Sequence, residues 1–268
     1  NSVSIYQFLA KKFSFRKYDG HICSTFFHQK EVTKKGIRTI VLPTLYPEDR
    51  LKNYCSKDLN KNKNFNLVFM GPIAKRENLQ RIIKSVNILR DRGYLISLYL
   101  ISSIPKLKNR KSFAKKLGKE IITDVKIISE FNRIKKYINS NPDIHITGFL
   151  SEHDKIKLLC KADAFIHLRK PSKETAWAFP TRLPEYAFHK KPIILSNCEP
   201  ISHYFTNRKN AILINPNNSI DSIISAIKEL YDNRKLCNKL GENVGKLASK
   251  HFSVTNVGDK LIKFIESF

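Results

Sequence analysis

The stretch FNLVFMG, residues 65–71, decides the fold class of this 268-residue chain. It is a short apolar run without a charge that stops at a glycine, which is typical of a strand buried on both faces. Residues 77–91 then carry apolar side chains at helical spacing, Gly93 ends that pattern, and residues 95–101 form a second apolar run. A strand, a helix and a second strand in this order predict parallel pairing.

The same alternation continues toward the C-terminus. We predict four further strands, at residues 144–147, 162–168, 192–195 and 211–214. A loop is expected from residue 169 to Phe179, and helices are expected over residues 107–140 (one or two, very basic), 152–160, 181–189, 219–232, 234–250 and 254–267. This pattern predicts an α/β fold: a Rossmann-like parallel sheet with helices on both faces.

The first part of the chain holds a smaller version of this pattern. A strand is expected at residues 20–24, a helix at 26–35 and a strand at 38–42. We therefore divide the chain into residues 1–45, a partial N-terminal α/β segment; 46–64, a linker; 65–252, the main domain; and 253–268, a C-terminal helix that crosses back to the N-terminal segment. Because the chain starts at Asn1 without a leader, we expect a piece of a longer protein.

Bulk composition excludes several classes of protein. An apolar fraction of 41% excludes a disordered chain, and no run approaches the length of a membrane-spanning helix. The net charge of +26 favours phosphate-bearing partners: nucleic acid, anionic lipid or a nucleotide. The alternative is a Lys- and Asn-rich background on solvated faces. The basic run at residues 106–119 is open to the same two interpretations, a solvated helix face or a patch for a membrane surface.

Cysteine and histidine spacing gives no metal signature. The cysteines are far apart and form no C-x-x-C pair, so we expect reduced thiols in a reducing compartment: Cys23, Cys55, Cys160, Cys198 and Cys237. The eight histidines are scattered and none pairs with a cysteine or an acid at ligand spacing, so no metal site and no cofactor are expected. His167, which alternates with apolar neighbours in a strand, is interpreted as a satisfied core residue.

The densest local signal is AFPTRLPEY, residues 178–186. If Thr181 caps a helix, Pro180 lies outside it and Pro184 falls where no intrahelical donor is lost. A helix start after a strand and loop offers free N–H groups to a phosphate, with Arg182 beside it and Glu185 one turn deeper to reach ribose hydroxyls. The alternative is an ordinary capped helix with a solvated Glu185.

Residues 179–186, followed by KPII at 191–194, resemble the donor-binding segment of the retaining, family-4-like glycosyltransferases, G-F-P-T-K-L-x-E-Y leading to G-x-P-V-I. Three further stretches resemble that family in the expected order: residues 68–71, 146–150 and 162–169. The resemblance extends over residues 18–268. It implies the GT-B architecture, two Rossmann-like domains facing a cleft, with residues 18–45 as the end of the acceptor-side domain.

The resemblance also implies roles for the matching residues of this segment. The backbone at Phe179, Pro180 and Thr181, with Arg182 in the position of a family lysine, would hold the donor pyrophosphate. Glu185 would accept hydrogen bonds from the ribose hydroxyls.

Residues at the ends of two strands complete the implied site. Arg169 would face the phosphates or the sugar, and Gly71 is the glycine turn after the first strand. Pro72 stands where many family members have an arginine, and Lys75 or Arg76 would supply charge instead.

Three departures from the family pattern lie nearby. Trp177 stands where the family has an earlier acidic residue, Ala178 replaces a glycine, and Lys190 replaces the glycine two positions before Pro192.

The expected function is sugar transfer from a nucleoside-diphosphate sugar to an acceptor hydroxyl, with retention, without a bound metal, in surface polysaccharide or glycolipid synthesis. Arg169, Arg182 and Glu185 would carry the chemistry. Expected partners are the nucleotide sugar, an acceptor glycan or lipid-linked glycan, and an anionic membrane surface, in the cytoplasm or at the inner face of the membrane; no nucleic acid is expected. The alternative is a non-catalytic basic protein that binds nucleic acid or anionic membrane.

Overall fold

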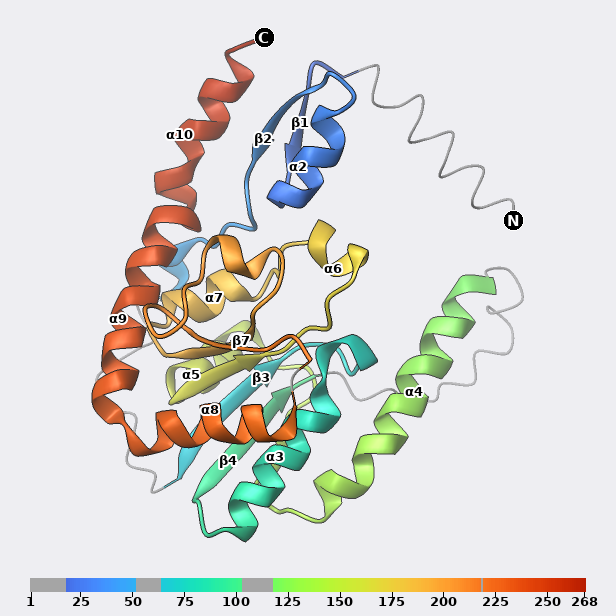
Figure 1. Cartoon of the computed structure of the whole chain (residues 1–268), viewed down its shortest axis with the longest axis vertical. Coiled ribbons are helices and arrows are strands. Elements are labelled where there is room, and N and C mark those ends of the chain that lie inside the picture. The colour runs from blue at the N-terminus through green and yellow to red at the C-terminus, as the bar shows by residue number, and fades with distance from the viewer. Residues whose placement is uncertain (1–17, 52–63, 103–117, 218) are drawn as a thin grey trace.

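The computed structural model describes residues 18–51, 64–102, 118–217 and 219–268, with no side chains for 118–127. Two separate parallel sheets form in these residues (Figure 1). The small sheet pairs β1 (Gly20–Cys23) with β2 (Arg38–Val41) around α2 (Phe26–Thr33). The predicted strand–helix–strand of the N-terminal segment is confirmed, with ends shifted by one or two residues.

The large sheet has six parallel strands in the order β5-β4-β3-β6-β7-β8. Its elements are β3 Phe65–Met70, α3 Leu79–Asp91, β4 Ile96–Ile101, α4 Gly118–Asn139, β5 Ile144–Ile146, α5 Glu152–Cys160, β6 Ala164–His167, α6 Lys173–Trp177, α7 Leu183–Phe188, β7 Ile193–Ser196, β8 Ile212–Ile214, α8 Ile220–Asp232 and α9 Arg234–His251. Counted along the chain this is the 3-2-1-4-5-6 order of a doubly wound Rossmann sheet, as predicted.

Two apolar cores, one on each face of this sheet, explain why its strands lack alternation. Phe65, Leu67 and Phe69 of β3 pack with α3 and α8, whereas Val68 and Met70 face the core that contains α7. Helix α9 contributes its first half to one core and its second half to the other. Every residue of β3 is buried, so apolar side chains are favoured at positions facing either side of the sheet.

Three helix predictions need correction or restriction. The expected loop before Phe179 contains the short helix α6, which starts because the Ser172 and Thr175 side chains form a capping box. The helix predicted over 181–189 is the shorter α7. Of the helix predicted over 107–140, the structure has α4, and most of the basic run at 106–119 lies outside the described residues.

The C-terminal helix α10 (Val254–Ile265) runs alongside the small sheet (Figure 1). The rings of Phe264 and Phe268 pack against Gly20 so closely that a side chain at this position would have to displace them. The small sheet with α2 is called the N-terminal unit, or small unit, below. Where the chain passes between this unit and the large sheet with its helices, the Tyr46 N–H donates to the Phe252 carbonyl at 2.8 Å.

Among the described residues, no helix combines the length and the apolar character that crossing a bilayer requires.

Candidate functional site

The site forms where β3 and β6 lie side by side and their connections leave in opposite directions. Open parallel sheets bind ligands outside the carboxyl ends of the strands at such a switch point. Gly71 follows β3 directly, and Arg169 lies two residues after β6. The Lys170 N–H donates to the Arg76 carbonyl at 3.0 Å, so the loops after the two strands are joined. The fold therefore brings Gly71, Arg76 and Arg169 to one edge of the sheet, as the sequence predicted.

Lys75 and Arg76, the two candidate cations after β3, differ in their surroundings. Lys75 is exposed in a short 3-10 helix, residues 75–77. Arg76 is held by two carboxylates: its Nε lies 3.3 Å from Glu77 Oε1, and its Nη1 lies 2.7 Å from Glu174 Oε1. A diphosphate would have to compete with these acids for Arg76, so Lys75 is the freer cation of the two.

Arg169 is a buried cation that organises the neighbouring segment. Its Nη1 donates to the Ala178 carbonyl at 3.1 Å, and its backbone N–H donates to Ser196 Oγ at 3.0 Å. Its Nε has no hydrogen-bond partner within the described part of the chain. Burial lowers the pKa of Arg169, and the nearby Glu77 carboxylate opposes this shift. Arg169 thus fixes the start of residues 178–186, while its Nε stays without a partner among the described residues.

Glu77 and His167 are site residues that the sequence analysis missed or misread. Both are almost fully buried, and Glu77 Oε2 lies 3.9 Å from His167 Nδ1. His167 is a core residue, as interpreted, but neither ring nitrogen finds a hydrogen-bond partner in the described residues, so the expectation that it is satisfied is wrong. Burial, with the charges of Arg169 and Arg182, lowers the pKa of His167 to about 3 and keeps the ring neutral. An acid shortly after the glycine turn was the only signal available for Glu77.

The helix start in residues 178–186 differs from the prediction. Thr181 is exposed and does not cap α7. Arg182 occupies the N-cap position with helical dihedral angles, and its side chain makes no capping hydrogen bond. The Leu183 N–H instead donates to the Pro180 carbonyl at 3.1 Å, so a turn precedes the helix. Pro184 still falls in the first turn, as expected. Phe179 and Pro180 are buried.

Glu185 is buried, so the alternative of a solvated carboxylate is wrong. Its Oε1 lies 2.9 Å from Lys155 Nζ, which also lies 2.8 Å from Glu152 Oε2. Burial raises the pKa of Glu185, and the contact with Lys155 opposes the rise. A ribose would therefore meet a carboxylate that already has a cationic partner.

Tyr186 contacts both strands of the switch point, β3 and β6. Its hydroxyl accepts a hydrogen bond from the Met70 N–H at 2.5 Å, and its ring stacks on Phe165 of β6 with centroids 4.2 Å apart. The tyrosine of the sequence motif thus positions the last residue of β3 before Gly71.

Trp177, which stands where the resembled family has an acid, turns toward the small unit. Its ring lies on His28 with centroids 4.5 Å apart, and its carbonyl accepts from Ser24 Oγ at 3.1 Å. Lys190, which replaces a family glycine, has φ 54°, a left-handed conformation that glycine adopts without strain. A left-handed conformation at this position would explain why the resembled pattern has glycine there.

The cysteines follow the prediction in part. Cys23, Cys198 and Cys237 are free thiols, but Cys160 is disulfide-bonded, which corrects the expectation that all five are reduced.

Comparison with known proteins relates part of this chain to one family. Residues 129–247 match the family model described as "Glycosyl transferases group 1". No curated protein matches the chain in sequence.

Solved structures match nearly the whole chain. The Anabaena HepE structure in complex with UDP and glucose is 14% identical, with a TM-score of 0.70 over 97% of this chain and 65% of that one. A glycosyltransferase from Rickettsia africae is 15% identical, with a TM-score of 0.71 over 95% and 67%. Sucrose-phosphate synthase from Thermosynechococcus elongatus is 12% identical, with a TM-score of 0.68 over 92% and 57%. At these identities the likeness shows the fold, and the chain spans about two thirds or less of each relative.

Proposed function

Residues 129–247 carry a group 1 glycosyltransferase segment, and from this premise we propose that the protein transfers a sugar from a nucleoside-diphosphate sugar to an acceptor hydroxyl. The observation that carries the proposal is Arg169: a buried guanidinium at the switch point of a Rossmann sheet, whose Nε has no partner among the residues that the structure describes. A buried cation there suits a ligand that brings its own negative charge. HepE, a structural relative, was solved with UDP and with UDP-glucose, which supports a uridine nucleotide as the first donor to test.

The proposed chemistry rests on cationic side chains. Cleavage of the bond between sugar and diphosphate leaves charge on the departing diphosphate, and fixed cations in a site that excludes water stabilise that charge. Arg169 and Arg182 both lie near enough to His167 to lower its pKa, so they share one region. We assign the diphosphate to these two arginines, with Lys75 at the rim, and propose that no metal ion is needed.

The neutral state of His167 is useful in this arrangement. A neutral imidazole offers one donor and one acceptor, whereas an imidazolium would add a third cation to a site that already holds two. A neutral His167 therefore limits the positive charge in the region that Arg169 and Arg182 share.

The ribose is assigned to Glu185. Its carboxylate can accept from two hydroxyls, and Lys155 holds it in place from the side of α5. Retention of the anomeric configuration, transfer of a hexose, and an acceptor in surface polysaccharide or glycolipid complete the proposal. The groups that bind the acceptor are assigned to the N-terminal unit.

The proposal is tested by calorimetry with UDP and uridine, after a thermal-shift screen of nucleoside diphosphates has confirmed the base. Arg169→Lys, Arg169→Ala and Arg182→Ala should lower the affinity for UDP about tenfold or more, about 1.4 kcal/mol, and the affinity for uridine less. Arg208→Ala removes an exposed arginine paired with Glu229 and is the matched control.

Equal losses for UDP and uridine would show that the arginines do not face the diphosphate. Absence of UDP binding, combined with tight and steeply salt-dependent binding of duplex DNA, would favour a basic nucleic-acid-binding protein instead.

A further inference from the structure

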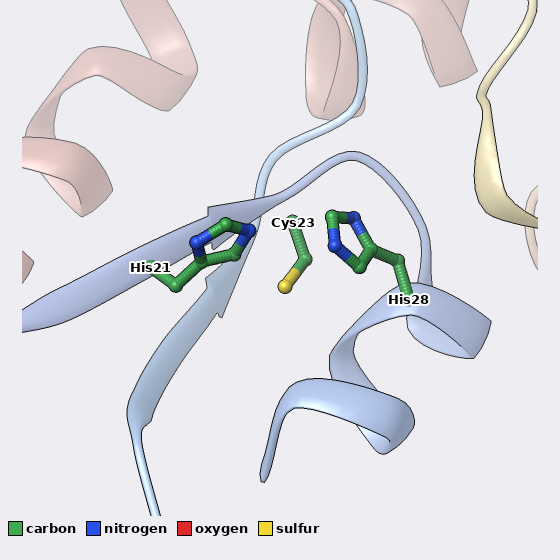
Figure 2. A group of neighbouring side chains, drawn as sticks. All are labelled: His21, Cys23 and His28. Atoms are coloured by element: carbon green, nitrogen blue, oxygen red, sulfur yellow. The ribbon is translucent and has the colours of Figure 1, made fainter. Parts of the chain in front are cut away.

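A group of metal-ligating side chains lies in the N-terminal unit, apart from the proposed donor site. His21 and Cys23 belong to β1, and His28 belongs to the first turn of α2. Their ligand atoms all lie within 4.8 Å of one another. Figure 2 shows the two imidazole rings flanking the Cys23 side chain. The sequence analysis expected no such group, because the spacing H-x-C-x4-H matches no common zinc pattern.

Local structure explains how this spacing forms a cluster. His21 and Cys23 are two residues apart on a strand, so they project to the same face, and Ile22 between them is exposed. Thr25 caps α2 and accepts from the His28 N–H at 3.0 Å, so the chain reverses at once. The reversal brings the first turn of the helix back over the end of the strand. The rings of His21 and His28 consequently meet edge to face, with centroids 5.1 Å apart.

We propose that His21, Cys23 and His28 bind a divalent transition-metal ion, with Zn²⁺ as the expected ion. Two imidazoles and one thiolate are borderline and soft ligands that suit Zn²⁺ and exclude Mg²⁺ and Ca²⁺. Bond lengths of about 2.3 Å to sulfur and about 2.0 Å to nitrogen require ligand atoms about 3.3–3.6 Å apart in a tetrahedron. The ligand atoms, which lie within 4.8 Å of one another, would have to move closer by rotation of the imidazoles about their side-chain bonds when an ion binds.

The geometry also indicates what the ion would do. Cys23 is completely buried and is a free thiol, whereas the histidines are half-buried, so an ion would enter from the histidine side. His28 lies on the Trp177 ring, and Ser24 donates to the Trp177 carbonyl. An ion that fixes His28 would therefore also fix the contact between the small unit and α6, directly before residues 178–186. Three protein ligands leave one coordination position for water.

Cobalt is the probe for this site, because Co²⁺ adopts zinc geometry and gives a charge-transfer absorption with a thiolate. The full chain, without a histidine tag, is treated with a chelator, dialysed and titrated with Co²⁺ and then with Zn²⁺ against a chromophoric chelator. We expect one equivalent of each ion and a thiolate charge-transfer band. Cys23→Ser should abolish the band, and His21→Asn and His28→Gln should each weaken Zn²⁺ binding at least tenfold.

Matched controls use the same residue types elsewhere. Cys198→Ser removes a half-buried free thiol, and His203→Gln removes a histidine paired with Glu199; both variants should keep the band and the stoichiometry. Far-ultraviolet circular dichroism of each metal-free variant confirms that the fold is retained. Absence of stoichiometric binding by the parent, or an unchanged band in folded Cys23→Ser, would overturn the assignment. UDP binding is measured separately, so failure of the metal site and failure of the donor site are distinguishable.

Discussion

Glu77, in the short 3-10 helix after β3, lies beside His167, the last residue of β6, with Oε2 and Nδ1 3.9 Å apart and both side chains almost fully buried. Because the ring is neutral, this contact is not an ion pair. The Glu77 carboxylate instead balances the cations around it, Arg76 at 3.3 Å and Arg169 nearby. Within the described residues, Glu77 Oε2 and both His167 ring nitrogens are buried without a hydrogen-bond partner, which is rare for buried polar atoms.

The first prediction compares the two acids that share Arg76. Glu77→Gln removes a buried negative charge beside Arg169 and should lower the free energy of unfolding by about 1–3 kcal/mol in urea denaturation. Glu174→Gln removes the exposed partner of the same arginine and should change it by about 0.5 kcal/mol or less. Equal effects of the two substitutions would show that Glu77 is not a buried counter-charge.

The second prediction concerns acid stability. Burial lowers the pKa of His189 to about 3, from 6.5 in the unfolded chain. As the pH falls below 6.5, His189 binds a proton in the unfolded chain but stays neutral in the folded chain. The free energy of unfolding is therefore highest at neutral pH and decreases toward pH 3. The loss between pH 7 and pH 5 is about 2 kcal/mol.

The measurement is urea unfolding of parent and His189→Gln at both pH values, and the variant should show a smaller loss by about 2 kcal/mol. His145→Gln, an exposed histidine on β5, is the control. Burial raises the pKa of Glu185, so protonation of Glu185 at low pH favours the folded chain and opposes the effect of His189. The test therefore compares the pH dependence of parent and variant and does not use the total pH dependence of the parent. An identical pH slope in the parent and His189→Gln would exclude a buried neutral imidazole.

The third prediction tests the link below the switch point. Tyr186→Phe keeps the ring stacked on Phe165 but leaves the buried Met70 N–H without an acceptor, so unfolding should require about 1–3 kcal/mol less. Tyr231→Phe removes a hydroxyl that accepts from the exposed Leu95 N–H at 3.4 Å and should cost little. Because β3 ends at Met70, the Tyr186 variant should also bind UDP more weakly; unchanged stability and affinity would contradict the prediction.

The fourth prediction uses two glycines in helices. An added Cβ at Gly241 would lie 2.2 Å from the Lys190 carbonyl oxygen, so Gly241→Ala must push α9 away from the end of α7 at a cost of about 1–3 kcal/mol. Gly258 in α10 has nothing within 4 Å of an added Cβ, and Gly258→Ala should raise stability by about 0.5–1 kcal/mol through helix propensity. Thermal unfolding measures both, and a stable Gly241→Ala would show that α9 is not in close contact.

Sequence periodicity predicts the fold well here because both faces of the sheet are covered. The buried strand at residues 65–70 and the amphipathic helix that follows have distinct patterns, and the structure has both within two residues of the predicted ends. The helix at residues 181–189 was predicted too long. Thr181 is a good capping residue in isolation, but the turn closed by the Leu183 N–H and the Pro180 carbonyl competes with it.

The site was predictable only where residues are close in sequence or match a family pattern. Arg169, at the end of its strand, lies where the sequence placed it. Glu77 and His167 are 90 residues apart and meet only because β3 and β6 are neighbours in the sheet, a pairing that periodicity does not specify. The cluster of His21, Cys23 and His28 is close in sequence, but it depends on a chain reversal at Thr25 and its spacing matches no common zinc pattern, so it was missed.

The passage of the chain between its two units has a mechanical consequence. The backbone crosses once near Tyr46 and again near Phe252, and the two crossings lie side by side, joined by a hydrogen bond and by the contact of Ser253 with Glu48. Paired segments of this kind restrain sliding and separation of the two units more than rotation of one unit about the line of the crossings. Rotation of the N-terminal unit about this line is therefore expected to separate Ser24 and His28 from Trp177, the contacts that lie away from the crossings.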